Sequence, residues 1–180
     1  SDRWHGEILR SWRGKRYGLV TLHRPSNVDN SDTLRVIIDT LACISKDLPL
    51  VFPVHPRTKK RLNELDIKFS NSNLWLIEPL SYLDFLALQS QSTLVITDSG
   101  GVQEETTFLG VPCLTLRDHT ERPVTVTLGT NTVVGQTHER LYLEVQRVIS
   151  GGYKKGKVPP LWDGHAADRI VDIIEEWWVC

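Results

Sequence analysis

The sequence has no excess of charge of one sign, no long apolar run and few cysteines. Its 180 residues include 21 lysines and arginines against 22 aspartates and glutamates, which gives a net charge of −1 at pH 7. Proteins that bind nucleic acid or an acidic membrane surface concentrate positive charge, so we expect no nucleic acid and no membrane among the partners of this chain. Any phosphate-binding site must therefore be local.

No apolar stretch approaches the roughly 18 residues of a membrane span, and the N-terminal residues from Ser1 to Trp4 do not resemble a signal peptide. The three cysteines are widely spaced and form no Cys-x-x-Cys pair, so we expect a reducing, cytoplasmic location. No histidine pair has the spacing of a metal motif such as His-Glu-x-x-His. The sequence therefore predicts neither a metal site nor a cofactor.

Short apolar runs alternate with helix-like stretches along the chain. The runs that predict buried strands span residues 18–23, 50–55, 74–77, 93–97, 113–116 and 132–134. The stretches that predict helices span residues 31–48, 57–65, 82–89, 138–149 and 165–179, with one more helix that follows Gly101 and ends near Leu109. The first of these helices is expected to have Asn30 or Ser31 as its cap and to end at Pro49.

Apolar strands of four to six residues that alternate with helices are typical of a parallel sheet with helices on both faces. We therefore predict one α/β domain over residues 1–180, a Rossmann-like doubly wound parallel sheet. Residues 1–16 are expected to be a linker or N-terminal extension, and residues 165–179 a C-terminal helix. Ligands of such sheets lie at the carboxyl ends of the strands, so the loops after the strands are the expected site.

Two of these loops combine a histidine with an arginine. His23 and Arg24 follow the first predicted strand, and His55 lies two residues before Arg57 after the second. Near a phosphate, histidine can act as a donor or general acid, and arginine supplies positive charge. The alternatives are that each histidine is structural and that the basic run beginning at Arg57 is a solvated helix face. The repeated combination favours a binding role for His23, Arg24 and His55.

The turn Ser99-Gly100-Gly101 follows the fourth predicted strand. Two glycines permit positive φ and let a ligand approach with no Cβ in the way. The free N–H groups of a helix start favour an anion, ideally a phosphate, although a plain strand-to-helix turn would have the same sequence. Glu104 and Glu105 in the following helical turn either suit the helix dipole or accept hydrogen bonds from the hydroxyls of a ribose.

The loop after the fifth predicted strand, residues 117–123, is mostly polar or charged. Within it Arg122 precedes Pro123, so a stiffened backbone presents a guanidinium at the expected ligand edge. Arginine is well suited to clamp a diphosphate. A surface loop with internal ion pairs is the alternative for this segment.

Together these segments resemble the UDP-N-acetylglucosamine 2-epimerase family. The matching runs are residues 20–27 (VTLHRPSN), 52–57 (FPVHPR), 78–85 (EPLSYLDF), 97–105 (TDSGGVQEE), 109–112 (LGVP), 117–118 (RD) and 120–123 (TERP). The resemblance covers about residues 17–175, in order, and the combination is specific where no single run is. Many relatives have a glutamate after the Thr-Glu-Arg-Pro run where this chain has Val124, a departure that bears on fine substrate or effector contacts.

The resemblance implies a fold and an activity. The family has the GT-B architecture, two Rossmann-like domains with UDP in the cleft between them, and this chain corresponds to the C-terminal domain. Members interconvert UDP-N-acetylglucosamine and UDP-N-acetylmannosamine by eliminating UDP and adding it back with C2 inverted. The implied small-molecule partners are therefore UDP and a UDP-N-acetylhexosamine.

The resemblance also implies roles for the loop residues around the phosphates. His23 should contact the diphosphate, while Ser99, Gly100 and Gly101 should contact the phosphates. Arg122 should neutralise diphosphate charge. In the elimination step these groups would stabilise the departing UDP, which makes His23 the candidate catalytic residue of this chain.

For the uridine, the resemblance implies two further contacts. Glu105 should hold the ribose. The segment from Leu80 to Phe85 should frame the uracil.

The resemblance places the acidic catalytic residues in an N-terminal domain that this chain does not contain. Proton abstraction needs a positioned base, so we expect the chain alone to bind UDP weakly and to catalyse nothing. Full-length relatives are expected to form homodimers, largely through that missing half. The C-terminal helix often crosses back to the first domain in GT-B proteins, so Trp177 and Trp178 are expected either to form an exposed apolar patch or to pack in the core.

Two other functions remain open at this point. The nucleotide-sugar domain of a GT-B glycosyltransferase would share the fold and the phosphate-binding helix start. A UDP-binding module without chemistry of its own would share them as well. The joint presence of the His-Arg-Pro-Ser-Asn and Thr-Glu-Arg-Pro loops favours the epimerase.

Overall fold

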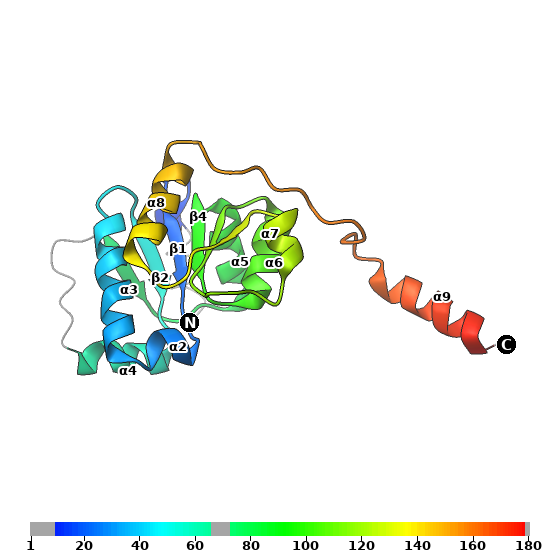
Figure 1. Ribbon diagram of the computed structural model, residues 1–180, viewed down its shortest axis with the longest axis horizontal. Coiled ribbons are helices and arrows are strands. Elements are labelled where there is room, and N and C mark those ends of the chain that lie inside the picture. The colour runs from blue at the N-terminus through cyan, green and yellow to red at the C-terminus, as the bar shows by residue number, and fades with distance from the viewer. Residues whose placement is uncertain (1–9, 66–72, 179–180) are drawn as a thin grey trace.

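The computed structural model describes residues 10–65 and 73–178 of the chain. Within these residues six strands form one parallel sheet in the order β3-β2-β1-β4-β5-β6. The strands are β1 (Gly18–Thr21), β2 (Leu50–Pro53), β3 (Leu74–Ile77), β4 (Leu94–Thr97), β5 (Cys113–Thr115) and β6 (Asn131–Val133). Helices lie on both sides of this sheet (Figure 1), so the predicted Rossmann-like doubly wound fold is confirmed.

The helices include two short ones that the apolar pattern did not predict. They are α2 (Pro25–Val28), α3 (Ser31–Ile44), α4 (Pro56–Glu64), α5 (Tyr82–Gln91), α6 (Gly100–Leu109), α7 (Pro123–Thr127), α8 (His138–Ile149) and α9 (Ala166–Trp178). The unpredicted helices are α2 and α7, with 4 and 5 residues. Each begins at a proline, which is preorganised for a first helical position, but neither is long enough to show a helical period.

Helix α3 begins where predicted and ends earlier. The Asn30 side chain caps it by accepting a hydrogen bond from the N–H of Thr33 at 2.9 Å. The helix ends at Ile44 and not at Pro49. Leu48 lies in the turn that follows and is buried, so the apolar spacing continues past the helix and the predicted end was wrong.

Consecutive residues of a strand point to opposite faces of the sheet, and two buried clusters result. Val20 and Ile96 belong to the cluster that α3 and α8 cover, whereas Leu19 and Val95 belong to the cluster that α5 and α6 cover. A sheet buried on both faces needs apolar residues at every position of its central strands. This requirement explains why the strands appear in the sequence as continuous apolar runs.

The sheet changes its direction of growth between β1 and β4. Strand β1 pairs with β2 on one side and with β4 on the other, where the register runs from Gly18 opposite Leu94 to Thr21 opposite Thr97. The loops that follow β1 and β4 therefore leave the same edge of the sheet side by side. Open α/β sheets bind their ligands in the crevice at such a switch point.

The two ends of the chain behave differently. Trp12, in the predicted N-terminal extension, packs against Tyr17 with ring centroids 5.3 Å apart, while residues 1–9 of that extension lie outside the described residues. No residue of helix α9 is buried. Figure 1 shows α9 standing away from the sheet at the end of the extended segment that follows α8. Residue 179, the last of the predicted helix, is also outside the described residues.

No helix among the described residues is long and apolar enough to cross a membrane. In the same residues no group of three or more histidine, cysteine, aspartate or glutamate side chains is arranged to hold a metal ion. Cys43 and Cys113 are free thiols. Burial raises the pKa of the Cys113 thiol to about 11, which makes it unreactive.

Candidate functional site at the carboxyl edge of the sheet

A buried carboxylate joins the loops after β1 and β4. Asp98 directly follows β4 and has no exposed surface. The backbone N–H of Arg24 donates to Asp98 Oδ2 at 2.9 Å, and the N–H of His23 lies 3.2 Å from both carboxylate oxygens. The His23–Arg24 loop, after β1, is thus held against the start of α6, after β4.

Asn27 extends this connection to β5 and β6. Its Nδ2 donates to Asp98 Oδ2 and to the carbonyl oxygen of Leu116, both at 3.0 Å. Gln136, in the loop after β6, donates to Asn27 Oδ1 at 2.6 Å. Neither Asp98 nor Asn27 was predicted as a site residue. Both lie inside the His-Arg-Pro-Ser-Asn and Asp-Ser-Gly-Gly runs, so the signal was present, but only the fold shows that they contact each other.

The N-terminus of α6 is open in front of this loop. Its cap residue Ser99 makes no side-chain capping hydrogen bond. No capping side chain therefore occupies the first N–H groups of the helix. An added Cβ at Gly100 or Gly101 would meet no protein atom within 4 Å. The space that these glycines leave is therefore not filled by the protein itself, and a helix start of this kind attracts an anion.

Two possibilities considered for α6 do not apply in the structure. Neither Gly100 nor Gly101 has a positive φ, because both are regular first residues of the helix. A left-handed backbone therefore does not explain why glycine stands at these two positions. No acidic residue lies in the first turn of α6. Glu104 and Glu105 lie further along, where the helix dipole has little effect on them, so the dipole does not explain these two carboxylates.

A buried chain of polar side chains holds the loop after β5 against α6. Gln103 donates through Nε2 to the carbonyl oxygen of Ser99 at 3.1 Å and accepts at Oε1 from Thr120 at 2.5 Å. Asn131 donates to the same Oε1 at 3.0 Å. The hydroxyl of Thr120 in turn accepts the backbone N–H of Arg122 at 3.0 Å, so the position of Arg122 is coupled to the start of α6.

The side chains of the loop after β5 form ion pairs. Arg122 Nε lies 2.8 Å from Glu104 Oε1. Arg117 donates to both oxygens of Glu121 at 2.6 Å, and this bidentate contact lowers the pKa of Glu121 to about 2. One ion pair internal to the loop, the alternative considered for this segment, is therefore present, whereas Arg122 pairs with α6.

A hollow of about 380 Å³ adjoins the His23 loop between β1, β2 and α5. His23, His55, Leu80, Tyr82 and Phe85 are among the residues that line it. The last two loop predictions, for His55 and for the segment from Leu80 to Phe85, thus fall on one surface with His23. His55 also caps α4, because its Nδ1 accepts the N–H of residue 57 at 3.3 Å.

Glu105 lies on the side of α6 that faces α5. Its Oε2 accepts a hydrogen bond from Gln89 Nε2 at 3.2 Å. Its charge and a hydrogen bond raise the pKa of the Tyr82 hydroxyl, which places the carboxylate next to a residue that lines the hollow. Glu105 therefore lies next to the apolar hollow, on the same helix as the open start.

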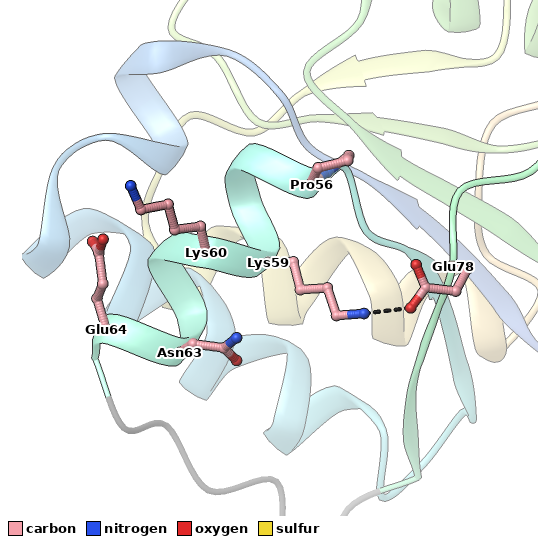
Figure 2. Close-up of a pocket in the computed structure, with 6 residues that line it drawn as sticks. All are labelled: Pro56, Lys59, Lys60, Asn63, Glu64 and Glu78. Carbon is pink, nitrogen blue, oxygen red and sulfur yellow. Dashed lines mark hydrogen bonds and ion pairs between the residues drawn. The ribbon is translucent and has the colours of Figure 1, made fainter.

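The basic side chains of α4 are not among the residues that line the hollow beside His23. A wider hollow of about 670 Å³ is lined by Lys59, Lys60 and Glu78 among others, and Figure 2 shows Lys59 reaching across it to pair with Glu78. Arg57 pairs with Asp29 at 2.5 Å. Most of the positive charge on α4 is thus neutralised locally, which supports a solvated helix face there and does not place Arg57 at the phosphate site.

The parallel sheet and the loops gathered at its switch point define a Rossmann-like α/β domain, a class of fold that binds its ligands at the carboxyl edge of the sheet. The sequence model of the family described as UDP-N-acetylglucosamine 2-epimerase matches residues 2–175. The chain therefore belongs to this family.

Individual relatives agree with the family match. The chain is 44% identical over 163 residues to a UDP-N-acetylglucosamine 2-epimerase of Methanocaldococcus jannaschii, covering 88% of this chain and 44% of that protein. A crystal structure of the enzyme from that organism in complex with UDP-GlcNAc and UDP has a TM-score of 0.81 at 41% identity, and covers 96% of this chain and 48% of that one. A Neisseria meningitidis epimerase bound to UDP-GlcNAc has a TM-score of 0.79 at 30% identity, covering 97% and 49%.

The chain spans about half the length of the curated relatives that it matches. A heptosyltransferase of Escherichia coli with ADP has a TM-score of 0.51 at 16% identity. That likeness shows a shared fold only. It lends no support to glycosyl transfer by this chain.

Proposed function

We propose that this chain is the C-terminal, UDP-binding half of an enzyme that interconverts UDP-N-acetylglucosamine and UDP-N-acetylmannosamine. The observation that carries this proposal is the position of the open α6 start, which lies beside the His23 loop at the switch point of the sheet. An anion site and an adjoining apolar hollow are the two parts that a nucleoside diphosphate requires.

In this proposal the diphosphate lies over the start of α6. The N–H groups of Gly100 and Gly101 donate to phosphate oxygens, and Ser99 adds a hydroxyl. His23 and Arg24 contribute from the neighbouring loop, which Asp98 holds in place. With a net charge of −1 on the whole chain, these local donors supply the positive potential that the composition lacks.

The uridine lies in the hollow beside the phosphates. Leu80 and Phe85 provide apolar surface for the uracil, and His55 also lines this hollow. Glu105 accepts hydrogen bonds from the ribose hydroxyls, because it is a carboxylate on the helix that begins at the phosphate site and lies next to the base pocket. Arg122, beside α6, neutralises diphosphate charge.

These groups act on the leaving group of the reaction. When UDP departs from C1 of the sugar, negative charge grows on the diphosphate, and donors fixed in advance stabilise that charge. His23 is the residue of this chain proposed to take part, as a donor to the departing phosphate. Removal of the C2 proton is assigned to the other half of the enzyme, so the chain alone is expected to be inactive.

Helix α9 is proposed to contact that other half. Its side chains Ile170, Ile173, Ile174 and Trp177 recur at helical spacing and are at least 56% exposed. Apolar surface of this kind is stabilised when a partner covers it. Pairing of two full-length copies, which the resemblance implies, would then also depend on the half that this chain lacks.

Thermal unfolding of the chain with UDP, UDP-N-acetylglucosamine, UMP, ADP and inorganic diphosphate tests the proposal. A ligand at 100 times its Kd adds about 2.7 kcal/mol, which for a domain of this size corresponds to about 5–10 °C in Tm. We expect UDP and its sugar to raise Tm more than UMP or ADP does. Equal shifts with ADP and UDP would contradict a uracil pocket, and no shift with any diphosphate would contradict binding by this half.

A further inference from the structure

The Asp98 carboxylate faces the imidazole of His23 as well as its backbone. His23 Nδ1 lies 3.3 Å from Asp98 Oδ1, and the histidine side chain is 47% exposed while the aspartate side chain is fully buried. One end of the ring is therefore next to a buried anion. Nε2 lies at the other end of the ring, farther from that anion.

The other groups that bind the Asp98 carboxylate donate mainly to its second oxygen, Oδ2. Asp98 Oδ2 accepts from the N–H of Arg24 at 2.9 Å and from Asn27 Nδ2 at 3.0 Å. Within the described residues, the hydrogen bond recorded at Oδ1 is the one that it shares with Oδ2, from the N–H of His23 at 3.2 Å. A buried carboxylate is costly unless its charge is compensated, and a proton on Nδ1 places a second N–H of His23 beside Oδ1, in addition to the backbone N–H that both oxygens share.

We propose that Asp98 is a positioning residue that keeps a proton on Nδ1 of His23 and so leaves Nε2 to face the ligand. This inference rests on the proposed function, because it assigns the ligand side of His23 in the UDP site. The hydrogen bond made by one ring nitrogen decides the role of the other. When the ring takes up a second proton, that proton goes to Nε2, which then donates toward the diphosphate while Asp98 balances the charge.

A purely structural role for Asp98 makes a different prediction. Asp98 would then tie the loop down through backbone N–H groups and Asn27, and the ring would be free to take either tautomer. The neutral side chain of a histidine in water favours the proton on Nε2, the reverse of the proposed state. The tautomer of His23 therefore separates the two roles without any ligand.

The first experiment measures that tautomer by long-range ¹H–¹⁵N NMR on the ¹⁵N-labelled chain at a pH where the ring is neutral. The variant His23→Gln identifies the His23 signal among those of the six histidines by removing it. We expect the Nδ1–H form in the unmodified chain. The Nε2–H form would overturn the proposal, whatever the chain is found to bind.

Two variants separate the imidazole contact from the anchoring of the loop. Asp98→Asn removes the charge that faces Nδ1, and is expected to move His23 toward the Nε2–H form. Asn27→Ala is the matched control, because it removes a different hydrogen bond from Asp98 and leaves the contact with the ring. It is expected to lower Tm while His23 keeps its proton on Nδ1; a change of tautomer in this control would overturn the proposal.

Binding of UDP to the same variants connects the pair to the ligand. We expect Asp98→Asn and His23→Gln each to weaken UDP by about 10- to 100-fold, the range for a hydrogen bond to a charged group. The double variant should bind no more weakly than His23→Gln alone, because Asp98 acts through the ring. Losses that multiply would overturn the proposal. Should Asp98→Asn fail to fold, the tautomer of the unmodified chain decides the question.

Failure of the proposed function would look different. In that case the unmodified chain would not bind UDP, while the tautomer measurement would still give its answer. A chain that binds UDP with His23 in the Nε2–H form would retain the proposed function and lose this inference.

Discussion

Arg122 Nε lies 2.8 Å from Glu104 Oε1, so the guanidinium at the end of the loop after β5 is held by the helix whose N-terminus is open. Both side chains are partly exposed, at 45% and 40%. An ion pair exposed to this extent contributes little to stability. The pair therefore matters more for where it places the guanidinium than for the free energy of folding.

Replacing Arg122 tests whether this guanidinium serves the ligand. We expect Arg122→Gln to weaken UDP and inorganic diphosphate alike, by about 10-fold, because both ligands carry the charge that it neutralises. Glu104→Gln should leave Arg122 free and strengthen both ligands by up to about 5-fold, the upper range for an exposed pair. Calorimetric titration measures both. Unchanged affinities in both variants would assign the loop to surface ion pairs alone.

Replacing Glu105 tests its role at the ribose. We expect Glu105→Ala to weaken UDP by about 10- to 100-fold through loss of hydrogen bonds to a charged acceptor, and to leave inorganic diphosphate unaffected since that ligand has no ribose. The comparison is made by titrating each ligand into the same protein sample. Equal losses for the two ligands would remove Glu105 from the ribose.

The glycines of α6 give a test in which stability and affinity change in opposite directions. Because Gly101 has ordinary helical φ and free space at its Cβ position, Gly101→Ala should raise the free energy of unfolding by about 0.4–1 kcal/mol. It should also weaken UDP, by about 10-fold or more, because the new methyl occupies the space of the phosphate.

The control for this test is Gly110, which ends α6 with φ of +72°. Gly110→Ala should lower stability by about 1–2 kcal/mol, the cost of a left-handed conformation for a residue with a Cβ, and should leave UDP affinity unchanged. Urea unfolding and UDP titration are measured on both variants. Full UDP affinity in Gly101→Ala would mean that no ligand occupies that space.

The Arg117–Glu121 pair predicts an acid-dependent contribution to stability. The contact lowers the pKa of Glu121 from 4.5 in the unfolded chain to about 2 in the folded one, so between these values the folded state binds fewer protons. Its stabilising contribution is then present above about pH 4.5 and lost as the pH falls toward 2. The stability difference between the unmodified chain and Glu121→Gln should shrink between pH 6 and pH 3 (roughly the onset and the middle of that loss). A difference independent of pH would contradict the pairing.

Helix α9 is expected to contribute nothing to the stability of the rest of the domain, which is the sheet and the helices that cover it. Deleting residues 163–180 should leave Tm within about 1 °C, because no residue of α9 is buried, and should reduce binding of a dye that reports exposed apolar surface. Leu141→Ala in α8 is the comparison, since Leu141 is 1% exposed and its truncation should cost about 2–5 kcal/mol. A large decrease in Tm on deletion would mean that α9 packs against the rest of the domain.

The strands and long helices could be predicted because burial on both faces of the sheet leaves a strong apolar pattern. Strand β3 and helix α8 begin and end at the predicted residues. The pattern was misleading at the end of α3, where Leu48 is buried outside the helix. It carries no information on α2 and α7, which are shorter than the stretch over which a helical period can be recognised.

For the candidate site, the sequence indicated which loops carry polar residues but not how they contact each other. Arg57 looked equivalent to Arg24 beside a histidine, yet Arg57 pairs with Asp29 on the surface while the backbone of Arg24 is bound by Asp98. Such pairings depend on residues more than 25 positions apart. Local spacing cannot reveal them, because only the sheet brings these residues together.

The order of strands has a consequence for how the chain folds. Strand β1 pairs with β4, and the N–H of His23 binds an aspartate 75 residues further along the chain. Closing a loop of that length precedes any gain from the contact, and non-local pairing of this kind slows folding. The His23 loop therefore reaches its final geometry only after β4 has joined the sheet, so the recovery of ligand binding during refolding should follow completion of the central strands.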